Sequence, residues 1–453
     1  MERFYIKKRI ERLTKEEKKK IIKKLIVLLG ATTLVGCIYS LKPIYIGICV
    51  IFTLLILPGF YRENEKEIKF RNRFECVVTY LEQMLYSFKK RPKIREALID
   101  AQKTSDNYMK ELIEEVVVNI DTKMSDNIYE ESLKIIEDEY PCRRVKSVHE
   151  FITKIEKQGG EYESYINILL QDIKAWNDRT RLFVKNVKRI KRNILISIGS
   201  TLLTCAFMTH IVPKDYSYSD KIAYQISTTV MLVIMMSVYY FVTKKLNFDW
   251  MKEAKGLDPR FIDRYYQIIY ENRGKTDKLN WMERSNYRTA KKRLEREVMR
   301  EFPDWMRETA VNLQIETVQS AIENSYENAA YVMKEPIKRI LLDFEQYPVG
   351  IEPYDNFLKE LDVKEVKSSM KMLYSMGELG KEESDVQIGS IIDRNIKLEN
   401  QSEEMKNSDR VGAASFLSVV PMFVGVIKIM LDMLLMILVF TGELSNVMQS
   451  GGI

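Results

Sequence analysis

Histidine and cysteine are scarce in this sequence of 453 residues. The only histidines, His149 and His210, form no HExxH motif and no Cys/His cluster, so we expect no metal site. We expect both histidines at a surface or an interface. The five cysteines include no CxxC pair, and their odd, scattered number argues against a disulfide framework and for reduced cytoplasmic domains.

A complete nucleotide-binding loop is also missing. Gly274, Lys275 and Thr276 look like the end of a phosphate loop, but Ile269 stands where that motif needs its first glycine. We interpret this stretch as part of a basic polar linker. No pair of carboxylates stands out as an acid/base dyad among 64 Asp and Glu. We therefore expect no enzymatic activity, no catalytic or cofactor-binding residues and no cofactor.

Motifs that read nucleic acid are absent, although the net charge is +7. Excess Lys and Arg is expected on the cytoplasmic side of a membrane protein, where it sets orientation and contacts anionic lipid. We therefore expect anionic lipid, and not nucleic acid, as a partner. No cleavable signal peptide is evident, and the expected location is the plasma or inner membrane, in multiple passes.

Long apolar runs dominate the sequence instead. Residues 194–212 and 222–242 each approach the roughly 20 residues that a helix needs to cross a bilayer, and residues 214–221 between them are polar. Residues 25–41 and 44–60 form a second, tighter hairpin. The basic residues before residue 194 mark that side as cytoplasmic, which also places the N-terminus in the cytoplasm.

The last apolar block, residues 413–440, is long for one span and contains Pro421 and Gly425. We predict one tilted span with an extracytoplasmic C-terminus, and a short re-entrant hairpin is the alternative. Lys428 and Asp432 lie four residues apart, so they can pair on one helical face inside the membrane.

These patterns predict an all-α, polytopic membrane protein with about five transmembrane helices and two cytoplasmic helical bundles. The predicted parts are a basic amphipathic cytoplasmic segment (1–24), a transmembrane hairpin (25–60), a first helical domain (61–193), a central transmembrane hairpin (194–243), a basic linker (244–300), a second helical domain (301–410), a C-terminal transmembrane helix (411–441) and an extracytoplasmic tail (442–453).

The two charged segments share an internal repeat. Three groups of residues recur in order: Ala97-Leu98 with Ala321-Ile322, Met109-Lys110-Glu111 with Met333-Lys334-Glu335, and Val145-Lys146-Ser147 with Val366-Lys367-Ser368. The separation is 224 residues for the first two groups and 221 for the third. Gly159 and Gly380 keep the second separation, as do Asp172 and Asp393.

This order resembles the F domain of platform proteins from type II secretion and type IV filament systems. Those domains carry an Ala-Leu helix, here Ala97-Leu98 and Ala321-Ile322, and a Glu-x-x-Gly turn before the last helix, here Glu156 to Gly159. The second copy departs from that spacing, with Glu378 two residues before Gly380. The N-terminal hairpin is similar to the TadB and TadC proteins of Tad (Flp) pilus systems.

The resemblance implies a non-enzymatic platform that couples a cytoplasmic ATPase to the extraction and assembly of pilin subunits. Its implied partners are a secretion or pilus ATPase, prepilin or pseudopilin subunits and other platform proteins in a homo- or hetero-oligomer. An alternative is a membrane signalling scaffold or receptor with helical partner-binding domains. A membrane-embedded enzyme or transporter would need polar residues in mid-membrane, where only Lys428 and Asp432 qualify.

Overall fold

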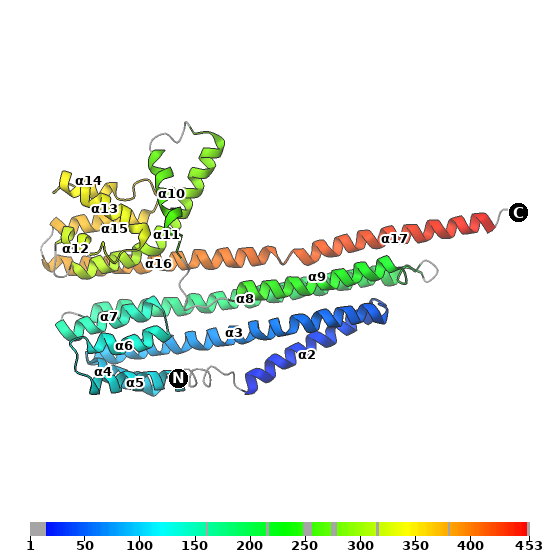
Figure 1. Cartoon of the computed structure of the whole chain (residues 1–453), viewed down its shortest axis with the longest axis horizontal. Coiled ribbons are helices and arrows are strands. Elements are labelled where there is room, and N and C mark those ends of the chain that lie inside the picture. Colours follow the sequence, from blue (N-terminus) through cyan, green and yellow to red (C-terminus); the bar gives the residue numbers. More distant parts are fainter. Residues whose placement is uncertain are drawn as a thin grey trace.

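The computed structural model describes residues 15–159, 162–213, 217–247, 256–272, 279–313, 317–378 and 381–450. All regular elements within these ranges are helices, and none is a strand, so the predicted all-α class is confirmed. The helices form an elongated molecule with helical bundles at one end and long helices running away from them (Figure 1).

Five helices are long and apolar enough to cross a membrane, as predicted. They are α2 (Lys15–Ile38), α3 (Pro43–Lys90), α8 (Glu163–Ile211), α9 (Ile222–Leu246) and a C-terminal unit made of α16 (Lys381–Phe416) and α17 (Val420–Ser450). Large apolar side chains such as Leu55 and Leu203 point outward from them, 73% and 74% exposed. An outward-facing apolar surface of this kind is compatible with a multi-pass membrane protein.

Two of these helices continue without interruption from an apolar half into a charged half. α3 has 48 residues and α8 has 49. At about 1.5 Å per residue, each is roughly 70 Å long, more than twice the thickness of a bilayer core. Each helix therefore joins the apolar end of the molecule to a helical bundle as one continuous element.

Most of the last apolar block lies in one continuous helix, α17, and not in a helical hairpin, while its first residues, 413–416, end α16. A short turn at residues 417–419 separates α17 from α16. Pro421 contributes to the turn, because proline has no N–H to donate to the carbonyl four residues earlier, at position 417.

The first bundle consists of the end of α3, α4 (Ile94–Thr104), α5 (Asn107–Thr122), α6 (Ile128–Glu139), α7 (Arg143–Gln158) and the start of α8. One hydrophobic core joins all six helices. The side chain of Asp106 caps α5 by accepting a hydrogen bond from the backbone N–H of Met109 at 2.9 Å.

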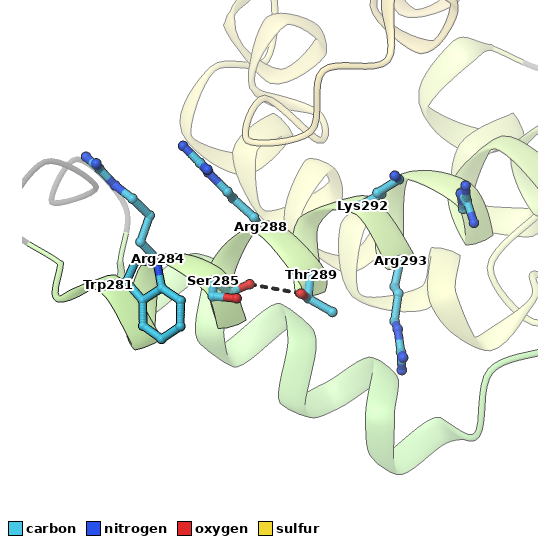
Figure 2. A pocket seen from close by; sticks show the side chains of 8 residues that line it. Trp281, Arg284, Ser285, Arg288, Thr289, Lys292 and Arg293 are labelled. Atoms are coloured by element: carbon cyan, nitrogen blue, oxygen red, sulfur yellow. Dashed lines mark hydrogen bonds between the residues drawn. The ribbon is translucent and has the colours of Figure 1, made fainter. Parts of the chain in front are cut away.

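The second bundle consists of α10 (Pro259–Glu271), α11 (Trp281–Asn312), α12 (Val318–Asn324), α13 (Tyr331–Gln346), α14 (Glu352–Asn356), α15 (Lys364–Glu378) and α16. Its core extends beyond the predicted boundary at residue 301, because α10 and the first half of α11 contribute to it. In α10, Ile262, Tyr265, Tyr266 and Ile269 are buried at helical spacing, while the exposed face of the first half of α11 is basic (Figure 2).

Equivalent positions are buried in the two bundles. Ile94, Ala97, Leu98 and Ala101 of α4 are buried, as are Val318, Ala321, Ile322 and Ser325, each 224 residues later. Both boundaries of α13 also lie 224 residues after those of α5. The separation becomes 221 where α14 replaces the longer α6, so that Val145 and Val366 both enter a core.

Candidate functional site

The Lys428–Asp432 pair predicted from the sequence forms on α17. The ammonium and one carboxylate oxygen make an ion pair within a single helix turn, and the two residues are only 2% and 3% exposed. The ammonium nitrogen also lies 4.0 Å from the centre of the Tyr224 ring on α9, a cation–π contact. The pair therefore faces the neighbouring helices and not the exposed apolar surface.

Polar groups from α8, α9 and the turn after α2 lie around this pair. The Tyr224 hydroxyl donates a hydrogen bond to the carbonyl of Tyr39 at 3.2 Å, and the Tyr39 hydroxyl donates to the carbonyl of Leu202 at 2.6 Å. One carboxylate oxygen of Asp432, Oδ2, is buried and has no hydrogen-bond partner within the described part of the chain. The carboxylate therefore has an unused acceptor in a buried position.

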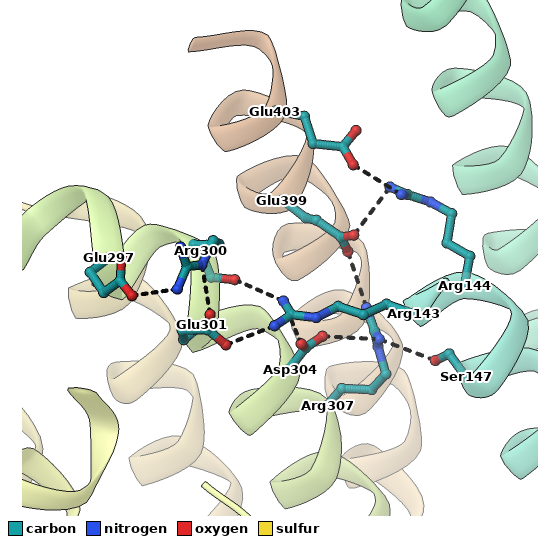
Figure 3. Close-up of polar contacts among 10 residues, drawn as sticks. All are labelled: Arg143, Arg144, Ser147, Glu297, Arg300, Glu301, Asp304, Arg307, Glu399 and Glu403. Atoms are coloured by element: carbon teal, nitrogen blue, oxygen red, sulfur yellow. Dashed lines mark hydrogen bonds and ion pairs between the residues drawn. The ribbon is translucent and has the colours of Figure 1, made fainter. Parts of the chain in front are cut away.

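A second buried group of charges lies between the two bundles (Figure 3). We call it the inter-bundle cluster. Its members from the first bundle are Arg143, Arg144, Asp172 and Arg179, and its members from the second are Glu301, Asp304, Arg307, Glu399 and Glu403.

Arg144 is the most buried cation of the inter-bundle cluster, with a side chain only 7% exposed. It contacts Asp172 of its own bundle at 2.8 Å, and Glu403 and Glu399 on α16 at 3.0 and 3.2 Å. An arginine presents five N–H donors and cannot lose its charge in proteins, so it can hold several carboxylates at once.

Arg143 and Arg307 complete the connection. Arg143 of α7 contacts Asp304 at 2.6 Å and Glu301 at 2.8 Å, both on α11. Arg307 of α11 contacts Glu399 at 3.2 Å and donates a hydrogen bond to the Ser147 hydroxyl of α7 at 3.1 Å. Each of these arginines therefore has at least two polar partners, and the contacts cross between the bundles in both directions.

The two carboxyls that α11 contributes to the inter-bundle cluster, Asp304 and Glu301, have pKa values shifted in opposite directions. Burial raises the pKa of Asp304 from its ordinary 3.8 to about 6, despite Arg307 and Arg143. Burial also acts on Glu301, but Arg143 and Arg300 outweigh it and lower the pKa of that carboxyl. Within the inter-bundle cluster, Asp304 is therefore a group that can change charge near neutral pH.

The family-motif positions have structural roles. Ala97, Leu98, Ala321 and Ile322 are fully buried core residues. The Glu156 carboxylate accepts a hydrogen bond from the backbone N–H of Ile94 at 2.6 Å, which caps the start of α4. The Tyr129 hydroxyl donates to the same carboxylate at 3.1 Å. Glu156 thus ties α7 to α4 and α6.

The glycine of the same motif ends α7. Gly159 has a positive φ of 72°, which glycine adopts without steric cost. In the second bundle, Glu378 is the last residue of α15, and Gly380 lies outside the described residues. The structure therefore assigns a role to the first Glu-x-x-Gly turn alone.

The prediction of a surface or interface position was wrong for His149, which is 1% exposed. Its ring nitrogens lie 2.8 Å from the Tyr80 hydroxyl and 2.9 Å from a Glu137 carboxylate oxygen. The helical spacing of α7 places it in the core beside Val145, Val148 and Ile152, where these two partners satisfy both nitrogens. His210, in contrast, is exposed.

The chain matches no protein-family model, no curated protein and no solved structure. In the part of the chain that the structure describes, no group of three or more His, Cys, Asp and Glu could hold a metal ion. A functional hypothesis for this protein therefore depends on the arrangement of the helices and on the two buried groups of charges.

Proposed function

We propose that this protein is a plasma- or inner-membrane platform of a type IV filament (Tad/Flp pilus) or type II secretion machine. In this proposal both bundles are cytoplasmic F-like domains, and the chain couples a cytoplasmic ATPase to the assembly of pilin subunits. Two observations support the proposal. α3, α8 and the α16–α17 unit run from the bundles into the apolar end of the molecule, and the inter-bundle cluster connects the two bundles.

Such an arrangement suits the transmission of movement. A partner that rotates or displaces one bundle also displaces the other, because buried arginine–carboxylate contacts resist separation. The continuous helices then carry that displacement to the apolar end. The connectors at that end are short, at residues 39–42 and 212–221, and offer little room for the sensor domain that a receptor needs.

A deletion strain of the native host tests the proposal. We expect loss of surface filaments or of secreted substrate, restored by the wild-type gene and by Lys146→Met, which changes an exposed cation of α7. Arg144→Met should restore neither, and the wild-type protein should co-purify with an ATPase that carries a GxxxxGK[ST] loop. Normal filaments and normal secretion in the deletion strain would contradict the proposal.

A further inference from the structure

The first half of α11 carries a stripe of exposed cations. Arg284, Arg288, Lys292 and Arg296 follow one another at intervals of four residues, so they share one helical face. The buried residues Ala290, Leu294 and Val298 occupy the opposite face and join the core of the second bundle. We call the four cations the basic stripe. Its charge is not required by the core packing of α11.

The Arg296 end of the basic stripe lies near the level where the apolar helices emerge from the bundles. Arg296 forms an ion pair with Asp409 of α16 at 3.2 Å. A few residues further along that helix, Ala414 is buried together with Leu246, the last residue of α9. In the view of Figure 1, α10 and the first half of α11 leave the long axis of the molecule sideways at this end of the bundle. A membrane around the five apolar helices would thus have its polar edge beside the stripe.

The side chains around the stripe form a pocket of about 420 Å³ (Figure 2). Five of its eight lining residues are Arg or Lys, and no carboxylate lines it. Trp281 stands at the tip of α11 and is 84% exposed. Tryptophan favours the headgroup region of a bilayer, where its ring is partly buried and its N–H can find an acceptor.

We propose that the basic stripe and Trp281 bind anionic phospholipid headgroups at the cytoplasmic surface of the membrane. The position beside the emerging helices, the single sign of charge and the exposed indole together favour a bilayer over a separate acidic protein. Binding fixes the first half of α11 against the lipid surface, and with it the second bundle. The inference does not depend on the proposed function, because it needs neither an ATPase nor a pilin.

The test uses the full-length protein in nanodiscs of phosphatidylcholine, with or without phosphatidylglycerol. The fluorescence of Trp281 is obtained as the difference between the wild-type chain and Trp281→Phe. With phosphatidylglycerol we expect emission at shorter wavelength and a fall of about half in acrylamide quenching, because the ring leaves water for the headgroup region. High salt should weaken both changes.

Charge-reversed variants supply the decisive comparison. Arg288→Glu/Lys292→Glu should abolish the response to phosphatidylglycerol. The matched control, Lys338→Glu/Lys359→Glu, makes the same change in net charge at exposed positions of the distal part of the second bundle and should keep the response. Thermal unfolding of both variants shows whether the fold is retained. The proposal is overturned if the wild type does not respond to phosphatidylglycerol, which is also the result expected if the stripe binds an acidic protein instead. It is equally overturned if the stripe variant responds as strongly as the wild type.

Discussion

The inter-bundle cluster and the Lys428–Asp432 pair bury charges in two different ways. The cluster joins separate helices, and Arg143, Arg144 and Arg307 each contact at least two carboxylates. The pair lies within one turn of α17, and Asp432 keeps a buried oxygen without a partner in the described structure. One group links parts of the molecule, whereas the other is confined to a single helix.

The identity of the cations sharpens this difference. Arginine keeps its charge in a protein, so the cations of the inter-bundle cluster cannot relieve a lost contact by losing a proton. Lysine and aspartate can both become neutral through a proton transfer. We infer that the cluster acts as a permanent connection, while the pair on α17 tolerates a change of partner. The following predictions test that difference.

The largest effect is expected for Arg144→Met. The substitution leaves the buried carboxylates of Asp172 and Glu399 without their shared cation, which costs about 3–5 kcal/mol of stability. Unfolding of the detergent-solubilised protein, followed by circular dichroism, measures the loss. Lys146→Met is the matched control, because Lys146 is 67% exposed and should change stability by less than about 0.5 kcal/mol. Equal stability of the two variants would mean that the cluster does not hold the bundles together.

A smaller effect is expected for Asp432→Leu. The change leaves Lys428 without a carboxylate and costs about 2–3 kcal/mol, because the lysine can limit the penalty by losing its proton. Lys428→Met/Asp432→Leu should recover most of that stability, since no buried charge then remains. The melting temperatures of the two variants in the same detergent provide the comparison. A double variant as unstable as the single one would show that the pair itself stabilises the packing of α17.

These two groups of charges differ in how far the sequence could predict them. Lys428 and Asp432 are four residues apart in an apolar block, so helical spacing alone predicted their contact. Arg144 and Glu403 are 259 residues apart, among 71 basic and 64 acidic residues, and no local pattern distinguishes them from solvated charges. The five apolar helices could likewise be predicted from local sequence, because each contains a continuous run of apolar residues.

The sequence analysis did not predict that residues of the linker, 244–300, join the core of the second bundle, and the reason is related. The apolar residues Ile262 and Ile269 of α10 are separated by tyrosines and charged residues, which gave this segment a polar average. Its helical spacing of Ile and Tyr was the available signal. The residues of α11 and α13 that α10 contacts could not be predicted from the sequence, because these contacts depend on tertiary packing.

The contact between the helix of the Lys428–Asp432 pair and α8 is tested by Gly425→Ala. A methyl group on Gly425 would collide with the side chain of Thr201 on α8, so we expect a loss of about 1–2 kcal/mol from overpacking. Gly442→Ala on the same helix meets no atom within 4 Å and should be neutral or slightly stabilising. Melting temperatures compare the two variants. Thr201→Ala should rescue Gly425→Ala, and an absence of rescue would assign the loss to another contact.

The smallest effect is expected for Asp304→Asn, which removes the titratable member of the inter-bundle cluster. Because the pKa of the folded carboxyl is raised to about 6, protonation favours the folded state, and this contribution is lost as the pH rises from about 4 through about 6. Asp304→Asn should therefore melt slightly higher than the wild type at pH 8, and the difference should disappear below about pH 4. Arg143 keeps Glu301 and Arg307 keeps Glu399, so neither cation is left alone. A variant that is less stable than the wild type at pH 8 would contradict this prediction. It would show that the arginine contacts of the ionised carboxylate stabilise the folded state by more than the burial of that carboxylate costs. Asp304 would then be a permanently charged partner, like Glu301.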